Sequence, residues 1–128
     1  MLRGLHYQLP PYTQAKLVRV IDGCVLDVAV DIRKSSPTFG QHVAKELTAQ
    51  NKYQLFVPHG FAHGFIVLSD SATFAYKVDN YYAPEHDRGI AFSDTQLKID
   101  WQLSPEELQL SDRDKILPSL VNAKDLFE

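Results

Sequence analysis

The sequence predicts an all-β fold in a single domain covering residues 1–128. Apolar, β-branched runs of strand length recur along the chain, and Gly, Pro, Asn and Asp separate them. No long segment has the 3.6-residue periodicity of an amphipathic helix. At 128 residues the chain is long enough to bury a core of its own. Short strands at regular spacing favour an antiparallel sandwich or barrel, so we expect a jelly roll of the cupin-like, double-stranded β-helix type.

The strongest strand signal is a predicted hairpin. Residues 16–22 (KLVRVID) and 24–33 (CVLDVAVDIR) are apolar and largely alternating, with Asp22-Gly23 between them. Further strands are predicted over residues 42–50, 53–57, 65–68, 73–78, 90–92 and 97–101. Residues 104–108 fit one helical turn, with serine as the cap and proline at the first helical position.

The composition restricts the kinds of partner. A net charge of −3 gives no general basic field, so we expect no nucleic-acid partner, and any anionic ligand must meet locally placed cations. The single cysteine, Cys24, allows no disulfide within the chain, which fits a reducing compartment. No apolar run approaches transmembrane length and no signal peptide is visible, so the prediction is a cytoplasmic protein that binds no membrane.

The densest polar cluster is residues 3–8 (RGLHYQ). His6 is the side chain best able to move protons near neutral pH, although a lone strand histidine is more often structural. Strict alternation places Leu2, Gly4, His6 and Gln8 on one face and Arg3 on the other. A bulge at Gly4 would turn the side chain of Arg3 or His6 so that both face the same side of the strand.

Two polar residues fall on apolar strand faces. Lys16 shares its face with two valines, which is costly unless its ammonium meets an anion or stays in water. Tyr76 lies between Phe74 and Val78 on one face, so its hydroxyl needs a partner. The alternatives are a strand-end lysine that reaches solvent and an ordinary core tyrosine.

The histidines also permit a metal hypothesis. His59 and His63 are four residues apart, and His6 could converge on them in a barrel. A cupin-type metal site would want a carboxylate soon after His63 on the same face, and none is present, so we predict no metal. His42 and His86 are expected at the surface.

A charge run, Asp112-Arg113-Asp114, precedes Pro118. Such a run is usually a solvated turn. The functional alternative is that one carboxylate turns inward and holds His6 in the tautomer that a base requires.

Four ordered motifs resemble the dTDP-4-dehydrorhamnose 3,5-epimerase family. They are RGLHYQ (3–8) with Lys16 ten residues after His6, PHGFAHGF (58–65), YKVDNYYAPEHDRGI (76–90) and LSDRD (110–114). The resemblance covers nearly the whole chain. It implies a cupin-like homodimer that uses no metal or organic cofactor. It also implies an epimerase that inverts C3 and C5 of dTDP-4-dehydro-6-deoxyglucose, giving dTDP-4-dehydrorhamnose, by removing protons next to the ketone.

The resemblance also implies residue roles, carried over motif by motif. His6 is the base, Asp114 pairs with it, and Tyr76 returns a proton from the other face of the sugar. Lys16 and His63 lie close to the sugar and its developing enolate oxygen.

The remaining implied residues bind the nucleotide portion. Arg3 and Arg113 meet phosphates, and Tyr81 and Tyr82 lie near the nucleotide. Asp87 stands where a glutamate is expected, and Arg113 where lysine is common, which alters reach and donor geometry.

The chain departs from the family at its start. Relatives have a substantial segment before RGLHYQ, so we expect an N-terminally shortened chain. Three alternatives stay open: an epimerase of a single centre, a catalytically inactive cupin that binds a sugar nucleotide, and a metal-dependent cupin enzyme.

Overall fold

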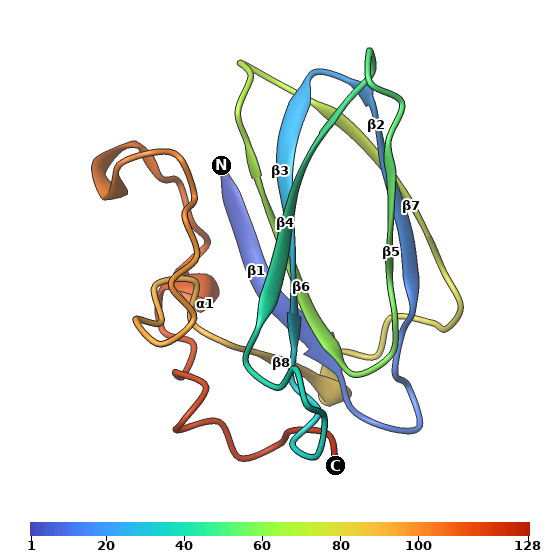
Figure 1. The fold of residues 1–128 in the computed structure, drawn as a ribbon, viewed down its shortest axis with the longest axis vertical. Helices are drawn as coiled ribbons and strands as arrows, with labels where there is room; N and C mark the ends of the chain where they lie inside the picture. The colour runs from blue at the N-terminus through green and yellow to red at the C-terminus, as the bar shows by residue number, and fades with distance from the viewer.

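The chain forms two antiparallel β-sheets that face each other, with an irregular C-terminal layer outside the larger sheet (Figure 1). The computed structural model describes residues 1–128 apart from the side chain of Pro105. The strands are β1 (Leu2–Gln8), β2 (Lys16–Asp22), β3 (Cys24–Asp31), β4 (His42–Thr48), β5 (Gln54–Val57), β6 (Phe61–Val67), β7 (Thr73–Val78) and β8 (Asp87–Gly89). Short helical turns are η1 (Pro84–His86), η2 (Pro105–Glu107) and α1 (Asp112–Lys115).

The strand order is β4-β3-β6-β1-β8 in the larger sheet and β5-β2-β7 in the smaller one. The predicted all-β, cupin-like fold is therefore confirmed. No helix in the described chain is long and apolar enough to cross a membrane.

The predicted hairpin is wrong. β2 pairs with β5 and β7, whereas β3 pairs with β4 and β6, so the two strands belong to different sheets. β3 is buried along nearly its whole length and needs a central place with both faces covered, whereas β2 has one apolar face. Gly23, at φ +88, turns the chain from one sheet to the other.

Several predicted boundaries also shift. β6 begins at Phe61 rather than Phe65, because its residues pair continuously with β3 from Phe61 to Val67. The apolar segments 90–92 and 97–101 are not strands. Their large side chains are instead buried against the outer face of the larger sheet, as Ile90, Leu97 and Trp101 show.

Two apolar clusters cover the two faces of the larger sheet. The outer cluster joins β1, β3 and β6 to the C-terminal layer. The inner cluster lies between the sheets and includes Val18, Val25, Leu47, Phe65 and Phe74. It fills only part of that space, and the remainder is the cavity described below.

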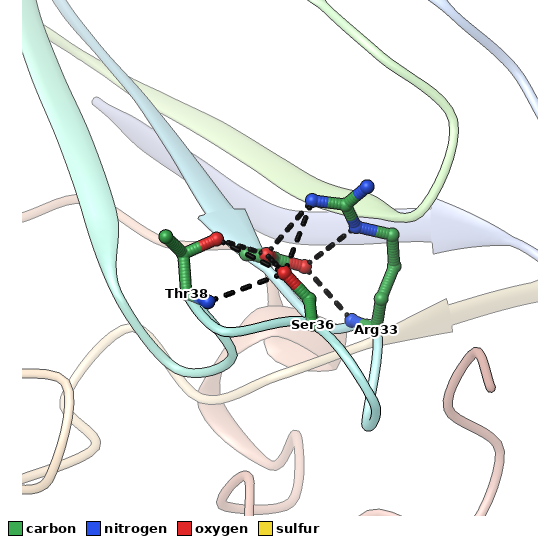
Figure 2. Close-up of polar contacts among 4 residues, drawn as sticks. Arg33, Ser36 and Thr38 are labelled. Carbon is green, nitrogen blue, oxygen red and sulfur yellow. Dashed lines mark hydrogen bonds and ion pairs between the residues drawn. The ribbon is translucent and has the colours of Figure 1, made fainter.

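The loop after β3 is tied back to the strand by one carboxylate. Asp31, 1% exposed, accepts hydrogen bonds from the backbone and guanidinium of Arg33 and from the hydroxyls of Ser36 and Thr38. Figure 2 shows these three residues converging on that carboxylate. Burial alone would raise the pKa of Asp31, but the hydrogen bonds outweigh it and hold the pKa well below its usual range.

Candidate functional site

A bulge in β1 decides which side chains enter the space between the sheets. Its register with β6 shifts between Arg3 and His6. Leu2, Leu5 and Tyr7 therefore pack in the outer cluster, while Arg3 and His6 both line the inner cavity. The face predicted by strict alternation is wrong for Leu2 and Arg3. Alternation had placed Arg3 and His6 on opposite faces, and the predicted bulge brings both to the cavity side.

Gly4 makes this bulge possible. Its φ is +121, and a Cβ there would lie 2.7 Å from Cα of Gly64 and 2.9 Å from the carbonyl oxygen of His63. Because neither backbone can retreat within the sheet, the close approach requires glycine at this position.

His6 is held by a buried carboxylate. Its Nε2 lies 2.6 Å from Oδ1 of Asp114, which is 3% exposed. The other oxygen, Oδ2, accepts the backbone N–H of Gly4 at 3.2 Å. Asp114 sits in α1, where the hydroxyl of Ser111 caps the turn by accepting its backbone N–H. The inward-turning alternative for the charge run is therefore correct for Asp114, and in the described chain Nδ1 of His6 has no hydrogen-bond partner.

A second histidine–carboxylate pair lies beside the first. His63 on β6 is the cross-strand partner of His6, and its Nε2 lies 2.7 Å from Oδ1 of Asp27. Asp27 on β3 is fully buried, and its Oδ2 has no hydrogen-bond partner among the described atoms. Sequence reasoning missed Asp27. The available signal was a carboxylate in the middle of an apolar strand, the same argument that identified Lys16.

The smaller sheet contributes Lys16 and Tyr76 from the opposite side. Both line the cavity, as the strand pattern predicted, with Lys16 at the start of β2 and Tyr76 on β7 beside Phe74. Tyr76 is 59% exposed, so its phenol stands in an open cavity rather than in the core.

Burial lowers the pKa of Lys16 below its usual range, while the carboxylates of Asp87 and Asp27 act in the opposite direction. A lowered pKa makes this ammonium a readier proton donor than that of a surface lysine, although the two carboxylates partly offset the effect of burial.

The rim of the cavity is cationic and aromatic. Arg113 on α1 forms an ion pair with Asp87 on β8, with 2.8 Å between Nη1 and Oδ2. Arg3 lies at the same rim, and Tyr81 and Tyr82 are 85% and 68% exposed there.

All ten residues singled out in the sequence line this one cavity, whose volume is about 1150 Å³. They come from β1, β2, β6, β7, β8, α1 and the loop after β7: Arg3, His6, Lys16, His63, Tyr76, Tyr81, Tyr82, Asp87, Arg113 and Asp114.

The three histidines of the metal hypothesis do not converge. His59 pairs with Asp79, 2.7 Å away at the surface, and no group of three potential ligands gathers among the described residues. His42 and His86 are both half-buried; 4.7 Å separates the ring centroids of His86 and Tyr12, and Nδ1 of His86 is buried.

The arrangement suits acid–base chemistry on an anionic ligand. An imidazole oriented by a carboxylate lies on one sheet and a phenol on the other, with a lysine and a second imidazole between the sheets. Fold and cavity together define a cupin-like protein whose cavity brings acid–base side chains together behind a cationic rim.

The comparisons with known proteins agree with this class. The family model described as dTDP-4-dehydrorhamnose 3,5-epimerase matches residues 1–122, and the chain belongs to this family. A dTDP-4-dehydrorhamnose 3,5-epimerase of Shigella flexneri is 58% identical over 114 residues, which is 89% of this chain and 62% of that protein.

Solved structures show the same similarity. A dTDP-6-deoxy-D-glucose-3,5-epimerase of Legionella pneumophila, in complex with dTDP-4-keto-L-rhamnose, is 54% identical with a TM-score of 0.92, covering 96% of this chain and 64% of that one. A 3'-monoepimerase of Streptomyces bikiniensis in complex with dTDP-quinovose is 36% identical with a TM-score of 0.84. The match covers 94% of this chain and 60% of that one. The chain thus spans about three-fifths of the length of these relatives.

Proposed function

We propose that this protein is a cofactor-independent epimerase that acts on dTDP-4-dehydro-6-deoxyglucose. It would invert the configuration at C3 and C5, the carbons flanking the ketone, to give dTDP-4-dehydrorhamnose. The observation that carries the proposal is that His6 and Tyr76 come from opposing sheets and line one cavity, in which Asp114 pairs with His6. Inversion at carbon needs a base on one face of the ring and an acid on the other.

In the proposed first step, Nδ1 of His6 takes the proton from the carbon next to the ketone. The C–H electron pair forms the enolate double bond, and the carbonyl π pair moves to oxygen. Asp114 stabilises the imidazolium that forms and keeps Nε2–H directed at its carboxylate.

The enolate would be stabilised by Lys16 and His63, which line the same cavity. Preorganised donors of this kind are often the largest contribution to catalysis. Asp27 would orient His63 as Asp114 orients His6, since the Nε2–Oδ1 distances are 2.7 and 2.6 Å.

In the second step, Tyr76 would donate its phenolic proton to the same carbon from the opposite face. The carbonyl reforms and the configuration is inverted. Exchange with water returns the proton to Tyr76 and removes the one on His6, and the cycle repeats at the second carbon.

The dTDP portion would lie at the rim. Arg3 and Arg113 would meet the diphosphate, Tyr81 and Tyr82 the nucleoside, and Asp87 would hold Arg113 in place. A homodimer and a cytoplasmic location remain predictions, which light scattering and fractionation of the producing cells would check.

A single-centre epimerase is the second candidate. The similarity to a 3'-monoepimerase at a TM-score of 0.84 supports it, because the same fold serves that reaction in a relative.

Proton NMR in heavy water tests both candidates. The protein is incubated with dTDP-4-dehydro-6-deoxyglucose, and the hydrogens at C3 and C5 are followed. Exchange at both carbons with formation of dTDP-4-dehydrorhamnose is expected. Exchange at one carbon would favour the second candidate, and no exchange with retained binding would indicate an inactive sugar-nucleotide-binding protein.

A further inference from the structure

The side-chain amide of Gln8 forms all of its hydrogen bonds with backbone groups of two loops. Gln8 is 4% exposed, and its Nε2 donates to the carbonyl oxygens of Tyr12 at 2.7 Å and Tyr81 at 3.0 Å. Its Oε1 accepts the backbone N–H of Ala83 at 2.9 Å. Both donor hydrogens and the acceptor are thus used, which is the requirement for a buried amide.

Two of these contacts lie on either side of Tyr82. The carbonyl of Tyr81 and the N–H of Ala83 flank it in the chain, so Gln8 fixes the backbone from which this side chain projects into the cavity. Tyr82 is highly exposed, and among the described residues it has no aromatic ring packed against its own. An exposed ring on a fixed backbone is well suited to receive another planar ring.

The loop after β7, which carries Tyr82, is also joined to the loop after β1 by hydrogen bonds that do not involve Gln8. Asn80 donates to the carbonyl of Pro11 at 3.0 Å, and Gln14 donates to the carbonyl of Asn80 at 2.9 Å. These bonds join the same two loops on the N-terminal side of Tyr81. Among these bonds, the two that Gln8 makes with Tyr81 and Ala83 are the ones that lie directly on both sides of Tyr82.

Gln8 also lies two residues after His6 on β1. The strand that carries the proposed base thus also fixes the position of the exposed tyrosine. A nucleotide sugar has a reacting sugar at one end and a planar base at the other. One rigid strand would then position the residues that contact both ends, so their separation is fixed.

We infer that Gln8 is a positioning residue that fixes Tyr82 as the stacking surface for the base of a bound nucleoside diphosphate, at a set distance from His6. The inference rests on the proposed function, because it takes the ligand to be a nucleotide sugar. It adds a residue that acts on the ligand only through Tyr82.

The test is a double-mutant cycle on dTDP binding by the 128-residue chain, measured by isothermal titration calorimetry. Gln8→Glu keeps the acceptor for Ala83 and replaces the NH2 group, which supplies both donors, with one oxygen that repels the carbonyls of Tyr12 and Tyr81. We expect Gln8→Glu and Tyr82→Ala each to raise Kd by about tenfold, comparable to the loss of one stacked ring. In the Tyr82→Ala background, Gln8→Glu should change Kd by less than about twofold.

Gln54→Glu is the matched control, an amide-to-carboxylate change on exposed β5, and we expect it to leave Kd unchanged. Should Gln8→Glu unfold below the assay temperature, Gln8→Asn is used, which keeps the amide but withdraws it by one methylene. In turnover assays Gln8→Glu should raise KM more than it lowers kcat.

Additive effects of the two substitutions would overturn the inference and leave the proposed function intact. An unchanged Kd in Gln8→Glu would do the same. Absence of dTDP binding by the wild-type chain would instead contradict the proposed nucleotide ligand, and the inference would fall with it.

Discussion

Asp114 and Asp27 are each buried against a histidine, and they differ in how fully they are satisfied. Asp114 has partners for both oxygens, His6 and the backbone N–H of Gly4. Asp27 has a partner for only one oxygen. A buried carboxylate is costly unless its oxygens are paired, so Asp27, with one unpartnered oxygen, is the residue whose burial lowers the stability of the fold.

Replacing Asp114 by asparagine should remove most of the proposed activity. The amide can occupy the same place but does not stabilise an imidazolium and can present the wrong hydrogen-bonding group to Nε2. We expect kcat to fall about 100-fold or more, measured as the initial rate of deuterium incorporation. Asp112→Asn is the control, since Asp112 lies fully exposed in the same helical turn and should retain the wild-type rate. Equal losses in the two variants would argue against the role of Asp114.

Single residues were the most predictable part of the site. Lys16 and Tyr76 were identified because alternation placed them on apolar faces, and both line the cavity. Asp27 was missed, although it breaks an apolar strand in the same way. Its pairing with His63 joins β3 to β6, and the sequence does not reveal which strands are neighbours.

At the scale of elements, the bulge in β1 is the feature on which the site depends most. It moves Arg3 to the cavity side together with His6 and leaves Leu5 and Tyr7 in the outer core. The sequence indicated that a bulge was possible at Gly4, but its effect on the faces depends on the register with β6.

Gly4→Ala should therefore be strongly destabilising. The substituted residue would need φ near +121, and its Cβ would lie 2.7 Å from Cα of Gly64. We expect the free energy of unfolding in urea to fall by about 2–4 kcal/mol. Gly40→Ala is the matched control, because Gly40 also has positive φ but its nearest neighbour is a leucine methyl at 3.6 Å. It should lose about 1 kcal/mol, and a similar loss at both positions would contradict the close-approach argument.

The Asp31 loop predicts a pH dependence of stability. Because hydrogen bonds from Arg33, Ser36 and Thr38 outweigh burial and lower the pKa of Asp31, the folded state binds its proton less readily than the unfolded chain. The stabilisation is therefore complete above the unfolded pKa of about 3.9 and is lost as the pH falls toward the folded pKa.

Urea denaturation of wild type and Asp31→Asn between about pH 6 and pH 2 measures this contribution. We expect the difference in unfolding free energy to be largest near pH 6 and to shrink below about pH 4. Asp70→Asn, in an exposed turn, should follow the wild-type curve. A difference for Asp31→Asn that does not change with pH would contradict the argument.

At the scale of the whole molecule, the site exists because two sheets face each other across an incompletely filled space. The larger sheet carries His6 and His63, and the smaller sheet carries Lys16 and Tyr76. The fold class was predictable from strand length and spacing. The assignment of strands to sheets was not, because Asp22-Gly23 is equally compatible with a hairpin and with the observed turn between sheets.

The C-terminal layer was also mispredicted for a physical reason. Its apolar residues cover the outer face of the larger sheet without forming strands. Periodicity over a few residues does not distinguish such a covering segment from a short strand.

The most direct test of the proposed base and acid compares His6→Ala with Tyr76→Phe in heavy water on dTDP-4-dehydro-6-deoxyglucose. His6→Ala should abolish exchange at both carbons, because no group remains to remove the proton. Tyr76→Phe should retain some exchange but form little inverted product, because His6 can only return a deuteron to the face from which it took the proton. Wild-type exchange in His6→Ala, or normal product formation in Tyr76→Phe, would contradict the account.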